Sequence, residues 1–294
     1  MPDSTLDTSV RIRALLPSLA PAERRVADRV LTDPAAVSAS TISALANECG
    51  TSETTVIRFC RAVGFTGYPA LRLALAAEGG RNGLGDGRDL AGDIVADDDL
   101  DKVVAKIAFA DARAVDETAQ QLDLRELHAV IEALVAAPRV DVYGVGASGF
   151  VAQDLQQKLH RIGRVSFAWA DPHMALTSAA LLTEGDVAVA ISHSGATQDT
   201  IDALEIARLS GATTVAVTNF PRSPLAVLGD HVLTTAARET TFRSGATASR
   251  LAQLTVIDCV FVGVAQRTYE SSQRALELTH AAVSSRRVDR KGTR

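Results

Sequence analysis

The chain has 294 residues, 47% of them apolar, and a formal net charge of −5 at pH 7. This length allows two domains with ample core material, and the mild acidity argues against a globally basic coat for nucleic acid. It still permits a small DNA-binding module whose few basic residues share one face.

The sequence carries no sign of a membrane protein. No uninterrupted apolar run reaches the ~18 residues that a membrane span needs, and the polar N-terminus lacks the apolar stretch of a signal peptide. Cys49, Cys60 and Cys259 are widely spaced, which fits a reducing compartment and offers neither a disulfide framework nor a zinc site. We therefore expect a cytoplasmic protein without a membrane partner, a bound metal or a cofactor.

Residues 1–78 predict an all-α domain of short helices. Pro21 opens one helix, whose apolar residues recur at helical spacing until Asp33-Pro34 ends it. Further helices are expected from Thr41 to Gly50, over residues 53–63 behind the N-cap Ser52, and over residues 68–77. The glycine-rich stretch that follows predicts a linker over residues 79–98.

The segment from Thr41 to Arg61 has the layout of a helix-turn-helix. Leu45 and Ala46 would pack against Val56 and Phe59, and Gly50 would turn the chain between the two helices. Exposed residues of the second helix would meet the major groove: Glu53, Thr54, Ile57, Arg58 and Arg61. Hydroxyls near the helix starts would donate to DNA phosphates: Thr41, Ser52 and Thr55.

An alternative interpretation of this segment is a three-helix protein-interaction module whose arginines only solvate its surface. The glycine at the turn, the hydroxyl residues at both helix starts and the two outward arginines together favour DNA binding. Because a single module makes few base contacts, operator specificity requires at least two copies related by a two-fold axis. We therefore expect a homodimer or a homotetramer.

Residues 99–280 predict an α/β domain. Helices are expected over residues 100–121 and 124–136, then strands over 140–143, 165–169, 187–191, 213–217 and 231–233, with helices between them. Continuous apolar runs are typical of strands buried on both faces, so the predicted fold is a doubly wound, three-layer α/β/α domain with a five-stranded parallel sheet. A long helix over residues 247–267 follows, and residues 281–294 form a polar, basic tail.

Two loops on this sheet point to an anion. Gly144-Val-Gly-Ala-Ser148 and Ser192-His-Ser-Gly-Ala-Thr197 each follow a strand and lead into a helix, where backbone N–H groups and hydroxyls can converge on a phosphate. The hydroxyls of Ser192, Ser194 and Thr197 suit a compact phosphomonoester, and Ser148 completes the cradle. The first loop also matches a dinucleotide fingerprint, with Asp171 about twenty residues later, but such a lone match is weak.

These motifs together resemble the RpiR-type transcription regulators, which join a helix-turn-helix to a sugar isomerase (SIS) domain. The resemblance extends from about Leu15 to Arg267 and rests on several segments besides the two loops: residues 21–28, 51–65, 67–69 and 243–254. It implies a DNA-binding regulator that senses a phosphorylated sugar with Ser148, Ser192, Ser194 and Thr197 and responds at an operator.

Three further residues complete the expected ligand site. Glu239 and Arg243 lie in the loop before the long helix and could reach the sugar end, although a surface ion pair is an equal alternative. His193 sits between two ligand serines and either contacts the ligand or fills the loop. An isomerase-type enzyme would need a general base, for which Glu239 and then His193 are the candidates, but we expect no enzyme activity. Trp169 ends a strand and is expected in the core.

Overall fold

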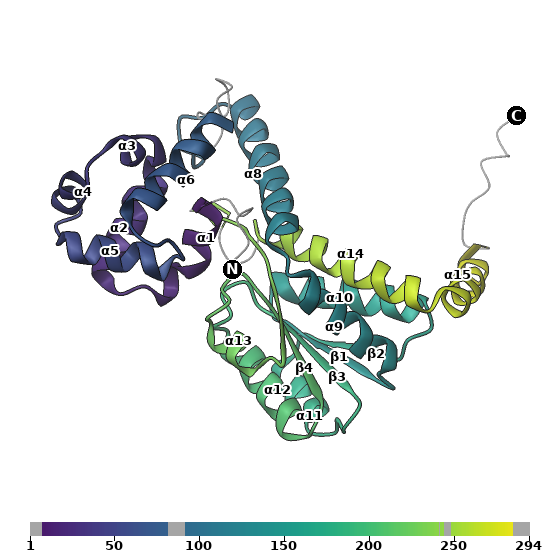
Figure 1. Ribbon diagram of the computed structural model, residues 1–294. Coiled ribbons are helices and arrows are strands. Elements are labelled where there is room, and N and C mark those ends of the chain that lie inside the picture. The colour runs from purple at the N-terminus through teal and green to yellow at the C-terminus, as the bar shows by residue number, and fades with distance from the viewer. Residues whose placement is uncertain (1–7, 82–91, 241, 244–247, 285–294) are drawn as a thin grey trace, which may run out of the picture. The chain divides into compact units, whose positions relative to one another are not determined.

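Figure 1 shows the computed structural model of the chain, which describes residues 8–81, 92–240, 242–243 and 248–284. These residues gather into two compact units. The first unit extends to Leu122 and also holds residues 219–223 and 234–252; the second holds residues 123–218, 224–233 and those from Gln253 onward. The helix over residues 100–121 therefore groups with the first unit, although the sequence assigned it to the second domain. The domain limits 1–78 and 99–280 stay predictions.

The first unit begins with a cluster of short helices. They are α1 (Thr8–Leu15), α2 (Pro21–Thr32), α3 (Pro34–Ala39), α4 (Ile42–Glu48), α5 (Glu53–Ala62) and α6 (Tyr68–Arg81), with a 3-10 turn η1 (Leu16–Ser18) after α1. Helices α2, α4, α5 and α6 match the four that the sequence predicted, and α1 and α3 are additional. The cluster is therefore all-α, as expected.

These helices share one apolar core. Leu45, Val56 and Phe59 are completely buried, Ala46 is nearly so, and all four belong to one cluster with Val26 and other residues of α2. The packing that the sequence predicted between the two helices of the helix-turn-helix is confirmed. Cys60 lies in the same core, where burial raises the pKa of its thiol to about 12 and keeps it uncharged.

The structure describes both ends of the predicted linker over residues 79–98, whose limits stay a prediction. Helix α6 continues through Gly79 and Gly80 to Arg81, since each glycine costs a helix only about 1 kcal/mol relative to alanine. Residues 82–91 lie outside the described part of the chain. After them, Lys106 of α8 (Leu100–Gln121) donates to Asp93 O at 2.8 Å and to the Asp98 carboxylate at 2.6 Å. These two contacts hold the segment from Asp93 to Asp98 against α8. The hydrogen bond from Lys106 lowers the pKa of Asp98 below its ordinary value.

The second unit is built on a five-stranded sheet of order β2-β1-β3-β4-β5. Its strands are β1 (Val140–Tyr143), β2 (Ser166–Trp169), β3 (Val187–Ile191), β4 (Thr213–Thr218) and β5 (His231–Thr234). Each lies within one residue of the expected range. The pairs β1/β2, β1/β3 and β3/β4 are parallel, and Tyr143 is in register with Ala190. The doubly wound fold class is confirmed, and its strand order reverses between β1 and β3.

Helices cover both faces of the sheet (Figure 1). They are α9 (Leu124–Ala136), α10 (Ala147–Arg161), α11 (Pro172–Ala179), α12 (Gln198–Leu209), α13 (Pro224–Leu228) and α14 (Arg250–Arg267). Helix α15 (Tyr269–Ser284) follows α14 and lies away from the sheet. The predicted start of the long helix, Thr247, lies outside the described residues. Helix α15 was missed, and it occupies residues 281–284 of the expected polar tail; the rest of that tail is not described. No described helix is long and apolar enough to cross a bilayer.

A buried carboxylate connects three elements on one side of the sheet. Asp141 of β1 is completely buried, and it accepts from both the Nε and an Nη of Arg139 at 2.8 and 2.9 Å. It also accepts from Trp169 Nε1 of β2 at 2.9 Å and from Ser178 Oγ of α11 at 2.6 Å. We call these four residues the Asp141 cluster. Burial and this negative charge together raise the pKa of the neighbouring Tyr143.

Candidate functional sites

The helix-turn-helix is fixed by capping at each of its bends. Thr41 Oγ1 accepts from Ala44 N at 3.2 Å, and Ser52 Oγ accepts from Thr55 N at 3.2 Å. Between the helices, Gly50 adopts a φ of +56°, which L side chains rarely tolerate. Thr51 N then donates to Ala46 O at 2.9 Å, so the turn closes as a Schellman motif. Thr41 keeps its hydroxyl proton for a further acceptor such as a phosphate, whereas the Ser52 hydroxyl also contacts Thr55 Oγ1, where either oxygen can donate.

The outer face of α5 presents the residues expected to meet DNA. Glu53, Thr54, Arg58 and Arg61 are exposed, and Thr55 is half-buried with its hydroxyl 3.0 Å from Ser52 Oγ. Glu53 accepts from Ser43 Oγ of α4, so its carboxylate is turned toward the preceding helix. These exposures agree with a groove-facing surface, while contact of each residue with DNA stays a prediction.

Three charged residues of α2 hold the helix-turn-helix in place. Arg25 donates to the carbonyls of Cys49 and Gly50 at 2.9 and 3.0 Å, which caps the C-terminus of α4. Arg29 pairs with Glu48 at 2.7 Å. Glu23 accepts from Ala20 N and pairs with Arg58 of α5 at 3.1 Å. The sequence analysis did not predict these contacts. The charged residues of α2 indicated that the helix makes polar contacts, but not which residues of α4 and α5 they bind.

The two phosphate-type loops leave the same edge of the sheet. Strands β1 and β3 are direct neighbours, and both loops begin where these strands end. This edge is also the point at which the strand order reverses, where doubly wound domains bind their ligands. The sequence placed both loops on one sheet, and the structure adds that their strands are neighbours.

In the second loop, three hydroxyls converge. Ser192 Oγ lies 3.0 Å from Thr197 Oγ1 and 3.5 Å from Ser194 Oγ. The backbone N–H of Gly195, whose φ is +60°, donates to Ser192 Oγ at 3.1 Å, and Ala196 N donates to Ser194 Oγ at 3.2 Å. Ser192 is buried, Thr197 is half-buried and Ser194 is exposed. The loop thus gathers hydroxyl and amide donors around the N-terminus of α12.

In the first loop, glycine allows a close approach of strand and helix. A Cβ on Gly144 would lie 2.7 Å from the carbonyl oxygen of Ser148, so only glycine fits there. Ser148 itself is buried in the first turn of α10 and accepts from Gln253 Nε2 of α14 at 3.4 Å. The other amide atom, Gln253 Oε1, is buried without a hydrogen-bond partner among the described residues. The sequence analysis did not single out Gln253, although a glutamine within a long apolar helix indicates a buried polar contact.

The three other residues predicted to contact the ligand are His193, Glu239 and Arg243, and they do not all lie in the same unit. His193 is half-buried in the second loop, and its carbonyl accepts from Thr218 Oγ1 of β4 at 3.2 Å. Glu239 and Arg243 belong to the first unit, where Glu239 accepts from Ser249 Oγ at 3.1 Å and Arg243 pairs with Asp111 of α8 at 2.5 Å. Each residue of this pair therefore has its own partner, and their role in ligand binding stays a prediction.

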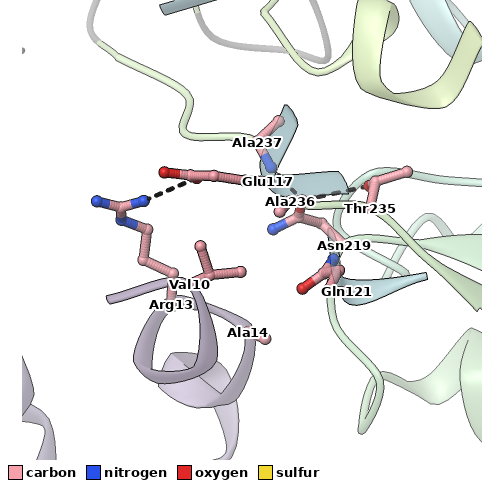
Figure 2. A pocket seen from close by; sticks show the side chains of 9 residues that line it. All are labelled: Val10, Arg13, Ala14, Glu117, Gln121, Asn219, Thr235, Ala236 and Ala237. Atoms are coloured by element: carbon pink, nitrogen blue, oxygen red, sulfur yellow. Dashed lines mark hydrogen bonds and ion pairs between the residues drawn. The ribbon is translucent and has the colours of Figure 1, made fainter. Parts of the chain in front are cut away.

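The first unit also contains a small hollow of about 200 Å³ (Figure 2). Figure 2 shows Arg13 of α1 directed at Glu117 of α8, 3.2 Å away. Asn219, the first residue after β4, accepts from Ala237 N at 2.7 Å and from Thr235 Oγ1 at 3.2 Å. The segments that follow β4 and β5 are therefore joined to each other within the first unit.

This segment after β5 also contacts α8. Ala236 N donates to Thr118 Oγ1 of α8 at 2.9 Å. Thr118 lies next to Glu117, which pairs with Arg13 of α1. A continuous set of polar contacts therefore leads from Asn219 through α8 to α1. Across the described residues, no group of three or more histidine, cysteine or carboxylate side chains is arranged to hold a metal ion.

Comparison with known proteins supports both kinds of domain. A family model described as "Helix-turn-helix domain, rpiR family" matches residues 7–81, and one described as "SIS domain" matches residues 133–263. An HTH-type transcriptional regulator of Caldanaerobacter subterraneus subsp. tengcongensis is 41% identical over 96% of this chain and 99% of its own. The chain belongs to the rpiR family of transcriptional regulators.

One solved structure resembles this RpiR-type regulator over nearly its whole length, and another resembles its sugar isomerase domain. The NanR protein of Vibrio vulnificus, complexed with ManNAc-6P, is 29% identical, with a TM-score of 0.60 over 96% of this chain and 100% of its own. The sugar isomerase domain of an RpiR transcription factor from Sphaerobacter thermophilus covers 61% of this chain and 99% of its own, with a TM-score of 0.57. At 24% identity, that second likeness shows the fold alone. The regulator thus joins the two kinds of domain that its sequence indicated.

Proposed function

We propose that this regulator senses a phosphorylated sugar at the edge formed by β1 and β3, and that the bound sugar changes its affinity for operator DNA. The observation that carries the proposal is the convergence of the Thr197 and Ser194 hydroxyls on Ser192 Oγ, at 3.0 and 3.5 Å, at the head of α12. NanR, similar over nearly the whole of both chains, was solved with ManNAc-6P, which supports a ligand of this class.

The chemistry of the loops suits a phosphomonoester. Hydroxyls and backbone N–H groups at a helix N-terminus stabilise a phosphate through short, charge-assisted hydrogen bonds. Ser148 reaches the same edge from α10, so two helix N-termini would face the anion. We assign Ser148, Ser192, Ser194 and Thr197 to the phosphate, with His193 beside it. Glu239 and Arg243 stay candidates for the sugar end.

The DNA-binding part of the proposal rests on the outer face of α5. Replacing Arg58 with alanine is expected to weaken operator binding by about 1–3 kcal/mol if its guanidinium reads a base edge. Its ion pair with Glu23 does not prevent this, because Arg58 is 61% exposed and surface pairs contribute only about 0–1 kcal/mol. A gel shift over a range of protein concentrations measures the change.

Arg24→Ala is the matched control for Arg58→Ala. It removes the same charge from α2, where Arg24 is exposed and donates to Pro17 O. Equal losses in both variants would mean that Arg58 contributes only general electrostatic attraction. We propose the corresponding contacts for Thr41, Ser52, Glu53, Thr54, Thr55 and Arg61.

Ligand binding must be coupled to DNA binding by a shared free energy. Whatever the sugar gains from one arrangement of the protein reappears as altered DNA affinity, typically about 1–3 kcal/mol. We propose that the contacts from Asn219 through Thr118 and Glu117 to Arg13 take part in this coupling. Because operator recognition needs two-fold related modules, we also propose a homodimer or homotetramer, acting in the cytoplasm, where the DNA lies.

A second candidate function is phosphosugar isomerisation, because the second unit has the fold of a sugar isomerase domain. Proton transfer between sugar carbons requires a positioned general base. Glu239 is the first candidate, but it lies in the first unit and accepts from Ser249. Relatives named as transcriptional regulators favour a sensor, so we propose that the protein does not turn its ligand over.

One experiment tests the proposed function as a whole. The full-length protein is screened by thermal shift against phosphosugars and the matching unphosphorylated sugars, since a ligand of the folded state raises the melting temperature. We expect a phosphosugar to raise the melting temperature and the unphosphorylated sugar to leave it unchanged. The same phosphosugar should change the affinity for operator DNA in a gel shift. A ligand that stabilises the protein but leaves operator affinity unchanged would contradict sensing. Product formed in the same incubation would instead establish an enzyme.

A further inference from the structure

Glu23 of α2 contacts an arginine on the helix that is expected to meet DNA. Its Oε1 accepts from Nε of Arg58 on α5 at 3.1 Å and lies 3.1 Å from one Nη of the same guanidinium. Its Oε2 accepts from Ala20 N at 3.3 Å at the start of α2, as the glutamate of a capping box does. Both oxygens of the Glu23 carboxylate therefore have a partner.

The two side chains of this pair differ in their exposure. The side chain of Glu23 is 12% exposed, whereas that of Arg58 is 61% exposed. Their helices are packed together, because Val26 of α2 is buried in the same apolar core as Val56 and Phe59 of α5. The cap and this packing fix the position of the Glu23 carboxylate. Glu23 thus offers a fixed acceptor to a long side chain that extends toward solvent.

The contact with Glu23 leaves the outer end of the Arg58 guanidinium available. A guanidinium carries five N–H donors in a planar fork, and Glu23 occupies the edge formed by Nε and one Nη. The N–H groups that point away from this edge, on the two Nη atoms, match the spacing of O6 and N7 of guanine. This bidentate pair is the commonest specific contact of arginine in the major groove.

We infer that Glu23 is a positioning residue for DNA recognition, which orients Arg58 toward a guanine before the duplex arrives. Ordering one long side chain on binding weakens a complex about 2- to 10-fold, and a side chain that is already held avoids this loss. The benefit is confined to duplexes with guanine opposite Arg58, because only there does the arginine make its bidentate contact. This inference rests on the proposed function, and it names the base that Arg58 reads and the residue that positions Arg58.

The negative charge of Glu23 has a second, opposite effect on DNA binding. A carboxylate near the duplex repels its phosphates, so removal of the charge strengthens binding to every sequence by the same factor. Loss of the positioning weakens binding only to duplexes that carry the guanine. The ratio of the affinities for two duplexes that differ in this one base pair therefore measures the positioning by itself.

A selection from a library of random duplexes identifies the base that Arg58 reads. The full-length protein is used without a sugar, and the sequences that the wild type enriches are compared with those that Arg58→Ala enriches. We expect one position in each half-site to lose its guanine preference in Arg58→Ala. In the wild type, the preference for guanine at this position should be about 5- to 150-fold, as for one bidentate contact.

Substitution of Glu23 gives the quantitative test. Glu23→Ala should lower the guanine preference at this position about 2- to 10-fold and leave the preferences at the other positions unchanged. Glu23→Gln keeps one acceptor oxygen for either Ala20 N or Arg58, so its effect should be smaller. In the Arg58→Ala background, Glu23→Ala should change no base preference. Thermal unfolding measures the stability that is lost with the cap, which acts on folding and not on one base pair.

Glu48→Ala is the matched control for Glu23→Ala. Glu48, at the end of α4, is 49% exposed and pairs with Arg29 of α2 at 2.7 Å. Its substitution removes the same charge and another ion pair of α2, but not the contact with Arg58. We expect the guanine preference of this variant to equal that of the wild type.

The outcomes separate this inference from the proposed function. If Glu23→Ala keeps the wild-type guanine preference, or lowers the preference at every position alike, Glu23 does not position Arg58 and only this inference fails. If Arg58→Ala loses affinity but no preference for guanine, Arg58 does not read this base, and the inference fails while DNA binding stands. If the wild-type protein enriches no sequence, the proposed function fails and this inference with it.

Discussion

Replacement of Asp141 by alanine is expected to lower the free energy of unfolding of the second unit by about 3–5 kcal/mol. Asp141 is completely buried and accepts from Arg139, Trp169, Ser178 and the hydroxyl of Tyr143, so its loss leaves four side chains without this acceptor. Arg139 is 27% exposed and can turn partly to water, which places the expected loss toward the lower end of this range. Urea unfolding followed by the fluorescence of Trp169 measures it.

The matched control for this prediction is Asp154→Ala. Asp154 lies on α10 of the same unit, is 30% exposed and pairs with Lys158 one helical turn away. Exposed pairs at this spacing contribute about 0.3–0.5 kcal/mol, so the unfolding midpoint should hardly move. Comparable losses in the two variants would show that the Asp141 cluster adds no more than a surface ion pair.

Local sequence patterns predicted the elements because each depends on residues close in the chain. Thr41 and Ser52 cap the helices that they precede, and Gly50 adopts the positive φ that its place at a helix end implied. Continuous apolar runs located the five strands to within one residue. The two hydroxyl loops could be placed on one edge because parallel strands end there together.

Contacts between distant residues could not be predicted in this way. The burial of Asp141 depends on Ser178, 37 residues later, and a lone aspartate in a short strand gives no sign of it. The supports from α2 to α4 and α5 likewise needed the folded arrangement. Helix α15 was missed, and only one of its residues, Ser272, is buried.

A hollow of the second unit that is lined by Gly144, Trp169 and Thr200 shows the same limit near the candidate site. Its lining comes from the end of β2 and the start of α12, about thirty residues apart in the chain. The sequence motif around Ser192 predicts a phosphate site, because a phosphate needs only one loop and a helix N-terminus. Recognition of the sugar depends on side chains from several elements, and these are brought together only by the fold.

The double substitution Ser192→Ala and Ser194→Ala is expected to remove the response to the phosphosugar. Hydrogen bonds to a charged group contribute about 1.5–3 kcal/mol each, so the loss of two donors should weaken ligand binding at least about a hundredfold. Ser192 also carries the contacts to Thr197 and Gly195 N, so the cradle itself loses its order. Operator binding without ligand should stay at the wild-type level, because both serines lie in the second unit, away from α5 in the chain.

Ser210→Ala provides the matched control for this double variant. Ser210 caps the opposite end of α12 and is half-buried, so its loss removes a hydroxyl from the same helix without touching the cradle. Calorimetric titration with the phosphosugar and a gel shift with and without it measure the two effects. A double variant that still binds and responds as the wild type does would place the phosphate elsewhere. A variant that loses unliganded operator binding as well would indicate that the loop supports the fold, since a pure ligand contact cannot act before the ligand arrives.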